Sequence, residues 1–590
     1  MIVSMKKVTV LAQRSDSSAL LNALQALGVI HVDALTPPSA SSEEIANRLR
    51  ELEQAHAFLS EAPKSAAPTV AEAPLTVQAA LALQQALQAH AAELAALERE
   101  LETFAPFGEV DPQRIAALAG HGLHLKLYTC HLEQMPALPE EVTVEILAQK
   151  GGQRWWTAIA RNAFALDLPE LPLPIHSTSA IAARAEALRG EIAQMRQQAA
   201  GMRQQLSDLK RERAQLEDQL RLARAGDQMA GSAALVSLQG YCPVDAVDAL
   251  SAAARQQGWG LIVTDPEAGD HIPTLIRNPR WLRPIEAVFD FIDTWPGYRE
   301  RDISLSFLIF FSLFYAILIG DAAYGTIFLI LLGVVHWRWG DRIPRQPLIL
   351  FYILNVATVV WGIFTGSYFG ITLAPDNPLL KLAFIDTSNQ KLMMIVCFTI
   401  GLVHMSLAHL WNAVCLINSL KAVAEIGWLL VLWACYFAAN NVIAGQEFPA
   451  FMLWVGVGGL VLALLCSGAL TDITELLQFP FKIFNAFGDI VSYLRLFAVG
   501  SASVALAQVF NDIAMSVGAS GPLAKLGMVL ILILGHVLNL ILGPLSVLVH
   551  GLRLNVLEFS SHLGQEWTGV RYAPLACRTA STPIKQGEPS

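Results

Sequence analysis

The stretch Gly488–Phe497, with the sequence Gly-Asp-Ile-Val-Ser-Tyr-Leu-Arg-Leu-Phe, places Arg495 inside an otherwise apolar run that is long enough to span a membrane. A guanidinium stays protonated at physiological pH, and a charge in the bilayer interior is costly unless it has a partner or a water-filled cavity. A second arginine, Arg553, follows in the similar run Ser546–Leu554. We therefore expect both arginines to be functional and the rest of the chain to hold them in place.

The composition indicates a large membrane part behind a soluble one. The chain has 590 residues, of which 54% are hydrophobic and only 15% are charged, whereas soluble proteins carry about a quarter charged residues. The first half is rich in Ala, Gln, Glu and Arg, and apolar runs begin near Ile303. We predict a soluble domain over 1–300, a membrane domain over 301–562 and a tail over 563–590. The net charge of −10 argues against nucleic acid as a partner.

The usual motifs of enzymes and cofactor sites do not occur in the sequence. There is no G-x-x-x-x-G-K-[ST] loop for ATP phosphates, no H-E-x-x-H and no G-x-S-x-G. The seven cysteines are scattered without metal-ligand or disulfide spacing. We expect no enzyme active site, no cofactor and no metal, so any energy must come from another subunit or an ion gradient. The N-terminus shows no signal peptide, which places the first half in the cytoplasm.

Two heptad seams dominate the soluble half, one over Leu83–Leu101 and a longer one over Leu188–Leu220. Strand patterns precede, separate and follow them. The fold class is therefore mostly α, with an antiparallel coiled-coil rod formed within one chain and two small α/β lobes at its ends. We expect Leu235–Val263 to complete the second lobe. A homodimeric coiled coil is the alternative.

The membrane half predicts about eight helices. The run Ile303–Val335 is too long for one crossing, and arginines flank it on both sides, so the positive-inside rule favours a hairpin of two short helices that turns near Gly320–Gly325. The later spans are Leu348–Phe369, Leu392–Ile417, Ala424–Ala439, Phe451–Leu470, Ala486–Phe510 and Leu523–Phe559. The last two exceed the hydrocarbon thickness, which predicts tilt. Eight crossings put both termini in the cytoplasm.

Polar side chains inside these spans are the candidate ion path. The last span carries a stripe along one face, which is either a buried polar seam between helices or an ion path; its members are His536, Asn539, Ser546, His550 and Arg553. Ser492 shares a face with Arg495, whereas Asp489 is either an access residue or a charge at a helix end. His404 and His409 form a second polar patch with Asn412, Glu425 begins the next span, and Asp321 is the one charge in the first run.

Two membrane arginines without a matching excess of acidic residues predict that the countercharge lies on another subunit. A rotating ring with one carboxylate per subunit would supply it. Such a carboxylate stays ionised beside Arg495 and must bind an ion when it moves into apolar surroundings. Two offset half-channels, one on each side of Arg495, then convert ion flow into rotation.

At these residues the chain resembles the membrane subunit of rotary V-type and A-type ATPases, called subunit a or subunit I, in its prokaryotic form. The matching segments occur in the family's order: Pro273–Pro279, Gly320-Asp321-x-x-Tyr324-Gly325, Gly362–Gly370, Ser492–Leu496 followed by Ala498, and His550 to Leu554 with Glu558. Two segments depart from the family pattern, Arg301–Ser304 and Gly500–Ala502.

The resemblance implies an ion-translocating stator subunit in the cell membrane that couples H⁺ or Na⁺ flow to ATP hydrolysis or synthesis. It implies that Arg495 faces the membrane rotor ring of c-type or K-type subunits, with Arg553 as its neighbour, and that the soluble lobes anchor peripheral stalk subunits E and G. The alternatives are a secondary transporter or anion channel that binds anions at the arginines, and a membrane-tethered scaffold. The identity of the ion stays open here, because the ion-binding carboxylate would lie on the ring.

Overall fold

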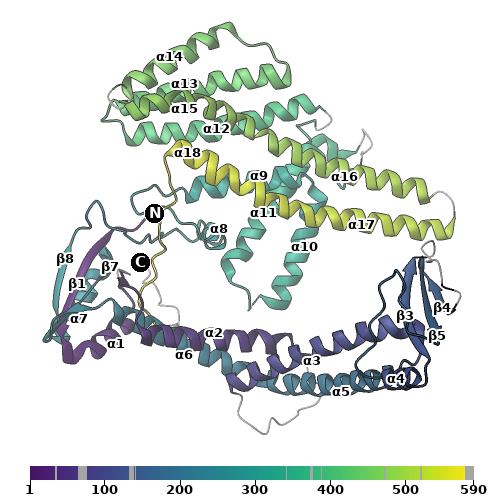
Figure 1. Cartoon of the computed structure of the whole chain (residues 1–590). Coiled ribbons are helices and arrows are strands. Elements are labelled where there is room, and N and C mark those ends of the chain that lie inside the picture. Colours follow the sequence, from purple (N-terminus) through teal and green to yellow (C-terminus); the bar gives the residue numbers. More distant parts are fainter. Residues whose placement is uncertain are drawn as a thin grey trace. The chain divides into compact units, whose positions relative to one another are not determined.

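The computed structural model describes residues 1–33, 36–63, 76–131, 139, 141–340, 342–371, 377–386, 389–468, 470, 473–518 and 521–577. The chain is mostly helical (Figure 1), as predicted. It divides into two compact units. The first contains Met1–Val8, Gly240–Ala253 and Ile262–Ala573, and the second contains Thr9–Gln239, Ala254–Leu261 and Pro574–Ser590.

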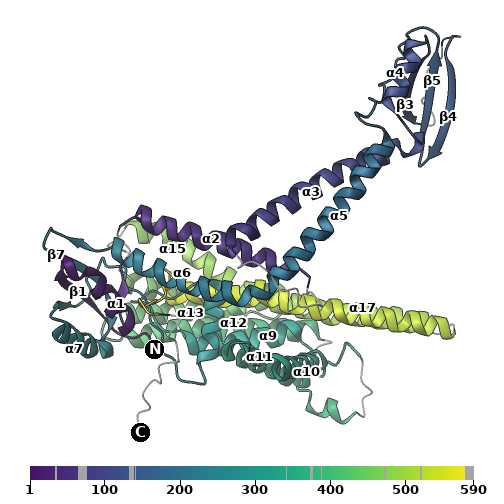
Figure 2. The ribbon, with the colours of Figure 1, turned by 90° about the horizontal axis from the view of Figure 1, so that it is seen from below.

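Four long helices in the second unit pack in two pairs (Figure 2). One pair is α2 (Ala40–Glu61) with α6 (Leu206–Asp227), and the other is α3 (Val77–Phe104) with α5 (Thr178–Met202). Buried leucines such as Leu52 and Leu209 fill the core of the first pair. The helices pair within one chain, as the prediction of an intrachain rod requires. A coiled coil in the strict sense stays a prediction.

A small sheet lies beyond the ends of α3 and α5. It is antiparallel, in the order β3-β5-β4, and its strands are β3 (His124–His131), β4 (Thr143–Lys150) and β5 (Gln153–Ala160). Helix α4 (Pro112–Gly120) packs on β3. Tyr128 and Trp156 stack in the core with ring centroids 4.8 Å apart. The sequence predicts strands over Leu123–Thr129, Val142–Ala148 and Trp155–Arg161, and the three strands of this sheet confirm them.

The other sheet has the order β2-β7-β1-β8, with β6 paired to β7. Its strands are β1 (Met5–Gln13), β2 (His31–Val32), β6 (Ala230–Gly231), β7 (Leu235–Pro243) and β8 (Gly260–Thr264), with helices α1 (Ser17–Leu27) and α7 (Val247–Gln257) in the connections. The expectation that Leu235–Val263 completes the second lobe, which contains β3, β4 and β5, is wrong. Strands β7 and β8 of this segment flank β1, so the segment completes the first lobe, which begins with β1.

Ten further helices, α9 to α18, make up the apolar part of the first unit. Their bounds are α9 (Ser304–Ile319), α10 (Ala322–Trp339), α11 (Arg345–Thr365), α12 (Gln390–Cys415), α13 (Lys421–Ala439), α14 (Ala450–Cys466), α15 (Ile473–Ser492), α16 (Leu494–Gly518), α17 (Pro522–Ser546) and α18 (Ser560–Leu563). π-Helical turns occur at Asn440–Ala444, Val547–Gly551 and Leu554–Phe559. Helix α8 (Glu286–Ile292) precedes them, and 3₁₀ turns lie at Arg14–Asp16, Ala105–Phe107, Arg203–Gln205, Val244–Ala246, Arg283–Ile285 and Pro378–Leu382.

Among the described residues, six helical segments are long and apolar enough to cross a membrane, and α9 and α14 are shorter apolar helices. The two longest are continuous over Ile473–Gly518, with 46 residues, and Leu523–Leu563, with 41 residues. At 1.5 Å per residue they reach about 60–70 Å, twice the hydrocarbon thickness of about 30 Å. Their length is as predicted. The number of crossings and the tilt remain predictions.

One span begins earlier than the sequence indicates. Helix α15 starts at Ile473 and not at Ala486, so Glu475 lies in its first turn and not in a loop. Glu475, Gln478 and Lys482 recur at spacings of three and four, which gives this first part a polar face. The apolar run in the sequence therefore begins later than helix α15 does.

The two short helices expected over Ile303–Val335 are present as α9 and α10 and turn where predicted, but they do not pack on each other as a hairpin. The chain turns at Gly320, in the left-handed conformation with φ 68°, and at Asp321. Both helices pack on α11 instead. The approach is close: a Cβ at Gly362 of α11 would lie 2.1 Å from the Ala322 nitrogen. Glycine is thus required where α11 crosses this turn.

Candidate functional site

Arg495 and Arg553 share one carboxylate. Arg495 lies in the first turn of α16, and its Nη1 is 3.8 Å from Oε1 of Glu558. Arg553 Nε is 3.4 Å from the same oxygen. The Glu558 side chain is only 4% exposed, whereas that of Arg495 is 23% exposed and that of Arg553 is 53% exposed. The two guanidinium groups therefore flank a buried acid from the last long helix.

π-Helical backbone creates this arrangement. In a regular α-helix, residues five apart point about 140° away from each other, which would separate Arg553 from Glu558. The turn over Leu554–Phe559 is π-helical, with hydrogen bonds between residues five apart. The wider turn brings Glu558 back to the face of Arg553. Helical spacing counted on the sequence does not reveal this pair.

The countercharge of the two arginines differs in part from the expected one. It is expected on another subunit, but Glu558 supplies one carboxylate within this chain. A single carboxylate balances only one of two guanidinium groups. Arg495 Nη1 and Glu558 Oε2 are buried and make no hydrogen bond to any residue that the structure describes. Arg495 thus keeps an N–H group for an additional acceptor.

A chain of four titratable side chains approaches Arg495 from the end of the membrane part where α9 begins and α18 ends. Glu425 Oε2 lies 2.6 Å from His409 Nδ1, and His409 Nε2 lies 2.9 Å from His562 Nδ1. His562 Nε2 then lies 3.0 Å from Asp489 Oδ2. The four residues come from α13, α12, α18 and α15 respectively. Asp489 is six residues before Arg495, about 9 Å along the helix axis.

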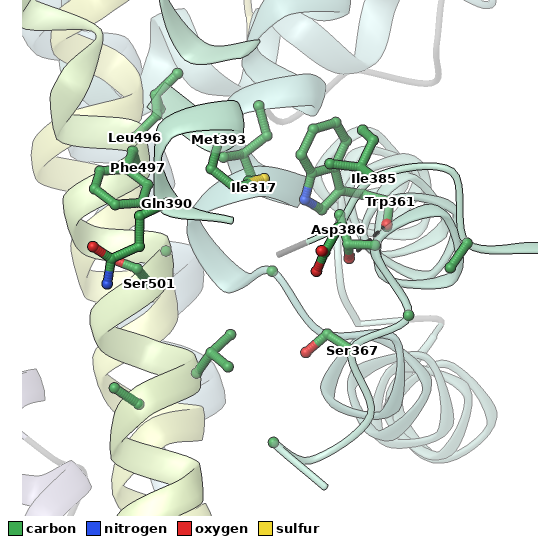
Figure 3. A pocket seen from close by; sticks show the side chains of 18 of the residues that line it. Ile317, Trp361, Ser367, Ile385, Asp386, Gln390, Met393, Leu496, Phe497 and Ser501 are labelled. Atoms are coloured by element: carbon green, nitrogen blue, oxygen red, sulfur yellow. Dashed lines mark hydrogen bonds between the residues drawn. The ribbon is translucent and has the colours of Figure 1, made fainter. Parts of the chain in front are cut away.

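A cavity of about 690 Å³ is lined by Leu496 and Phe497, the two residues that follow Arg495 in the sequence (Figure 3). The end of α9, the end of α11, the loops between α11 and α12, and α16 enclose it. Leu496 and Ser501 of α16 line it opposite Ser367 and Asp386, and Gln390 lies at the start of α12. The cavity therefore brings polar groups to the residues that follow Arg495 on α16.

The cavity and the four-residue chain lie at opposite ends of α12. Gln390 lines the cavity and His409 belongs to the chain, which places them about 28 Å apart along the helix axis. On the continuous helix α15–α16, Asp489 precedes Arg495 and the cavity-lining residues follow it. Two polar regions thus flank Arg495 along the continuous helix α15–α16, one before it and one after it.

His404 lies in an aromatic core and not in either polar region. Its ring stacks between Phe310 and Phe559, with centroid distances of 3.8 and 4.3 Å, and its side chain is fully buried. Its Nδ1 lies 2.8 Å from the hydroxyl of Tyr493, at the break between α15 and α16. Gly401 leaves room for the Tyr493 ring, since a Cβ there would lie 2.6 Å from it. This arrangement fixes the backbone immediately before Arg495.

The stripe on the last span divides into two parts. His536 Nδ1 lies 2.7 Å from the Tyr324 hydroxyl, and Asn539 bonds to that hydroxyl and to Ser503. These two side chains form the polar seam that the sequence analysis gives as one alternative. Ser546 donates to the Leu542 carbonyl of its own helix.

His550 is half-buried and Arg553 is exposed. Ser492 is half-buried at the end of α15, three residues before Arg495. His550 and Arg553 lie closer in sequence to Glu558 than the His536 seam does, and the role of all three residues in ion movement stays a prediction.

Asp321 acts as a cap. Its Oδ1 accepts from the backbone N–H groups of Ala323 and Tyr324, at 2.9 and 3.2 Å, and thereby begins α10. Its Oδ2 accepts from the Ser367 hydroxyl at 3.0 Å and from the Gly370 N–H at 3.3 Å. The side chain is 1% exposed. These four hydrogen bonds join α10 to the loop after α11, so the geometry favours a structural role over ion transfer.

Sequence reasoning missed His562 and did not assign Glu425 to the site. His562 is the last residue of the predicted membrane domain, and a histidine at the end of a helix does not by itself indicate a functional site. The signal that was available is the polar pair His409 and Asn412, which share one face of α12. Asn412 donates to Glu425 Oε2 at 3.4 Å and to the His562 carbonyl at 3.0 Å.

The comparison with known proteins gives long sequence matches. The chain is 32% identical over 628 positions to "V-type ATP synthase subunit I 1" of Treponema pallidum, covering 98% of this chain and 100% of the relative. A subunit I of Borreliella burgdorferi is 34% identical over 57% of this chain and 59% of its own length. "A-type ATP synthase subunit I" of Methanocaldococcus jannaschii is 27% identical over 53% of this chain and 50% of its own length.

No family model matches the chain. One solved structure, the cytoplasmic N-terminal domain of a V-ATPase subunit I, aligns with 44% of this chain and 99% of its own, at 19% identity and a TM-score of 0.22.

Proposed function

The chain belongs to the subunit I family of V-type and A-type ATP synthases, and on that premise we propose that it is the stator subunit that carries ions past Arg495. The observation that carries the proposal is the position of Arg495 between two polar regions. The Glu425–Asp489 chain reaches the helix before Arg495, and the cavity lined by Ser501 reaches it afterwards.

The proposed acceptor for Arg495 is a carboxylate on a ring of c-type or K-type subunits. Beside a guanidinium an acid stays ionised, so a ring carboxylate that arrives at Arg495 must release its ion. As it moves away into lipid it must be neutral again, so it must bind an ion from the region on the other side. Arg495 prevents direct passage between the two regions, and ion flow therefore requires rotation of the ring.

Glu558 orients the two arginines for this task. Its Oε1 lies within 3.8 Å of both guanidinium groups, which fixes them relative to each other. Because the Arg495 side chain is still 23% exposed beside Glu558, a ring carboxylate can approach the guanidinium without displacing Glu558. Preorganised donors of this kind require little rearrangement when the charge arrives.

The paired helices of the second unit suit a mechanical role. Surface ion pairs such as Arg184–Glu93 and Arg189–Glu98 cross between α5 and α3. We propose that this soluble part faces the cytoplasm together with both chain termini, binds peripheral stalk subunits E and G and resists the torque of the ring. The ATP sites then lie on other subunits and the chain is not itself an enzyme. A relative that matches over nearly the full length of both chains favours this assignment over a secondary transporter or anion channel.

Thiol labelling tests the two-sided access. In a chain whose seven cysteines are replaced, Ser501→Cys in the cavity and Glu425→Cys at the outer end of the four-residue chain are each exposed to a membrane-impermeant thiol reagent. We expect Ser501→Cys to react from one side of the membrane only and Glu425→Cys from the opposite side only. Leu453→Cys, on an apolar exposed position of α14, is the unreactive control. Labelling of both sites from the same side would contradict the proposal.

A further inference from the structure

The four-residue chain is continuous, linear and closed to ions. Its two imidazoles are in direct contact, with 2.9 Å between His409 Nε2 and His562 Nδ1. Their side chains are 7% and 10% exposed, whereas the carboxylates at the two ends, Glu425 and Asp489, are 22% and 25% exposed. The interior of the chain is therefore covered and both ends are open.

We propose that Glu425, His409, His562 and Asp489 form a proton relay, which commits this side of the site to H⁺ and excludes Na⁺. The inference rests on the proposed function, whose transported ion the sequence leaves open. It adds Glu425 and His562 to the ion path and assigns the chemistry that each member performs.

The proton transfer balances with neutral imidazoles at the start and the end. A proton bound to Glu425 passes from Oε2 to His409 Nδ1, while the Nε2 proton of His409 passes to His562 Nδ1. The Nε2 proton of His562 passes to Asp489 Oδ2. Glu425 ends as a carboxylate, Asp489 ends protonated, and both rings have exchanged tautomers. Each of the three hydrogen bonds reverses direction and none is lost, so the relay runs equally in the other sense.

Asn412 ties one end of the relay to its second imidazole. Its side-chain nitrogen donates to Glu425 Oε2 and to the His562 backbone carbonyl. The amide thereby orients the Glu425 carboxyl group, which is the first proton donor, and holds the helix end that carries His562. Chains of acidic residues and histidines inside a membrane are a recurring means of moving protons.

A metal cation does not fit the same path. Hard cations take several oxygen ligands, whereas the middle of this chain offers two imidazole nitrogens in direct hydrogen-bond contact. The four side chains follow one another in a line and do not converge on a point. Among the described residues, no group of three or more His, Cys, Asp or Glu side chains is arranged to hold a metal ion. A proton crosses such a contact by bond exchange, without space for an ion.

The test uses the assembled complex in sealed vesicles, with ATP-driven acidification and ²²Na⁺ uptake measured in parallel. His409→Gln and His562→Gln keep polar side chains of similar size but cannot exchange a proton between two ring nitrogens. The matched control is His336→Gln, a histidine of α10 that bonds to the Tyr352 hydroxyl at 3.3 Å outside the relay. Glu425→Gln and Glu425→Asp give a second pair at the open end, where only the aspartate still titrates.

We expect acidification without ²²Na⁺ uptake in the wild type. His409→Gln, His562→Gln and Glu425→Gln should lower acidification at least tenfold, as is usual when a positioned acid–base group is lost. His336→Gln should retain the wild-type rate and Glu425→Asp most of it, with subunit assembly unchanged throughout. ATP-driven ²²Na⁺ uptake by the wild type, or wild-type acidification in both histidine variants, overturns the relay. Either outcome leaves the role of Arg495 intact, whereas wild-type transport in Arg495→Ala removes the proposed function itself.

Discussion

Arg553 Nε and Glu558 Oε1 lie 3.4 Å apart although the two residues are five positions apart in the sequence. The π-helical turn between them makes the contact possible, and the same carboxylate lies 3.8 Å from Arg495. Glu558 is thus the one described acid that touches both arginines of the site. π-Helical turns inside α-helices are frequent at functional sites.

Glu558→Gln should leave two guanidinium groups close together without a countercharge between them. Removing one partner of a buried ion pair is strongly destabilising, but solvent access to Arg553 reduces the effect, and we expect a loss of about 1–3 kcal/mol. Transport should fall with it. Thermal denaturation of the purified complex measures the first effect and vesicle transport the second. Glu566→Gln, at an exposed residue eight positions later, is the control, and equal behaviour of the two variants would contradict the role of Glu558.

Gly362→Ala should prevent correct packing of α11 on the turn at Ala322. The added Cβ would lie 2.1 Å from a backbone nitrogen, which cannot move away as a flexible side chain can. We expect loss of the assembled complex from the membrane. Gly333→Ala in α10 meets nothing within 4 Å and should assemble normally. Immunodetection of the subunit in purified complex distinguishes them, and normal assembly of Gly362→Ala would show that the turn is wrongly placed.

Asp321→Ala should remove four hydrogen bonds from the junction of α10 with the loop after α11. Loss of a helix N-cap alone costs about 1 kcal/mol, and the orphaned Ser367 and Gly370 donors increase the cost. Asp321→Asn keeps one acceptor oxygen and should lie between Ala and wild type in resistance to heat. If Asp321→Asn remains as stable as wild type but loses transport, the carboxylate has the ion-path role that the sequence analysis assigns to it.

The Lys7–Asp270 pair should make stability depend on pH. The hydrogen bond from Lys7 lowers the pKa of Asp270, the Glu267 N–H adds to this effect, and burial opposes it weakly. A lowered folded-state pKa contributes stability above the unfolded value of about 4, which is lost as the pH falls through the folded value. Asp270→Asn should therefore be less stable at pH 7, by about 1 kcal/mol or less, and this deficit should shrink as the pH falls below about 4.

Thermal unfolding at pH 7 and near pH 3 measures the difference. Asp265→Asn, which removes the 82% exposed partner of Lys6, is the matched control and should change stability at neither pH. A deficit of Asp270→Asn that persists unchanged at pH 3 would contradict the pKa assignment.

The extent of sequence prediction differs between the fold and the site. Heptad leucines and strand patterns locate the paired helices and the sheet of β3–β5, because burial imposes a fixed period on one chain segment. Which lobe receives Leu235–Val263 is set by strand pairing over more than 200 residues, and local pattern carries no information about it. The fold of the turn at Gly320 is likewise decided by close contact with Gly362.

The residues around Arg495 illustrate the same limit. The cost of a buried charge identifies Arg495 and Arg553 from sequence alone. Glu558 escapes helical counting because the backbone is π-helical, and His562 escapes because its partners come from two other helices, α12 and α15. His404 and Asp321 are polar residues in apolar runs, which favours an ion-path role on the sequence alone. In the structure an aromatic stack holds His404, and four hydrogen-bond donors hold Asp321.

The most direct test of the account is ATP-driven ion transport by the assembled complex that carries Arg495→Ala, reconstituted in sealed vesicles beside the wild type. In the proposed mechanism, this variant removes the guanidinium that separates the two polar regions and that faces the ring carboxylate. The account predicts a normally assembled complex whose ion transport is abolished. Transport at the wild-type rate in that complex would contradict it.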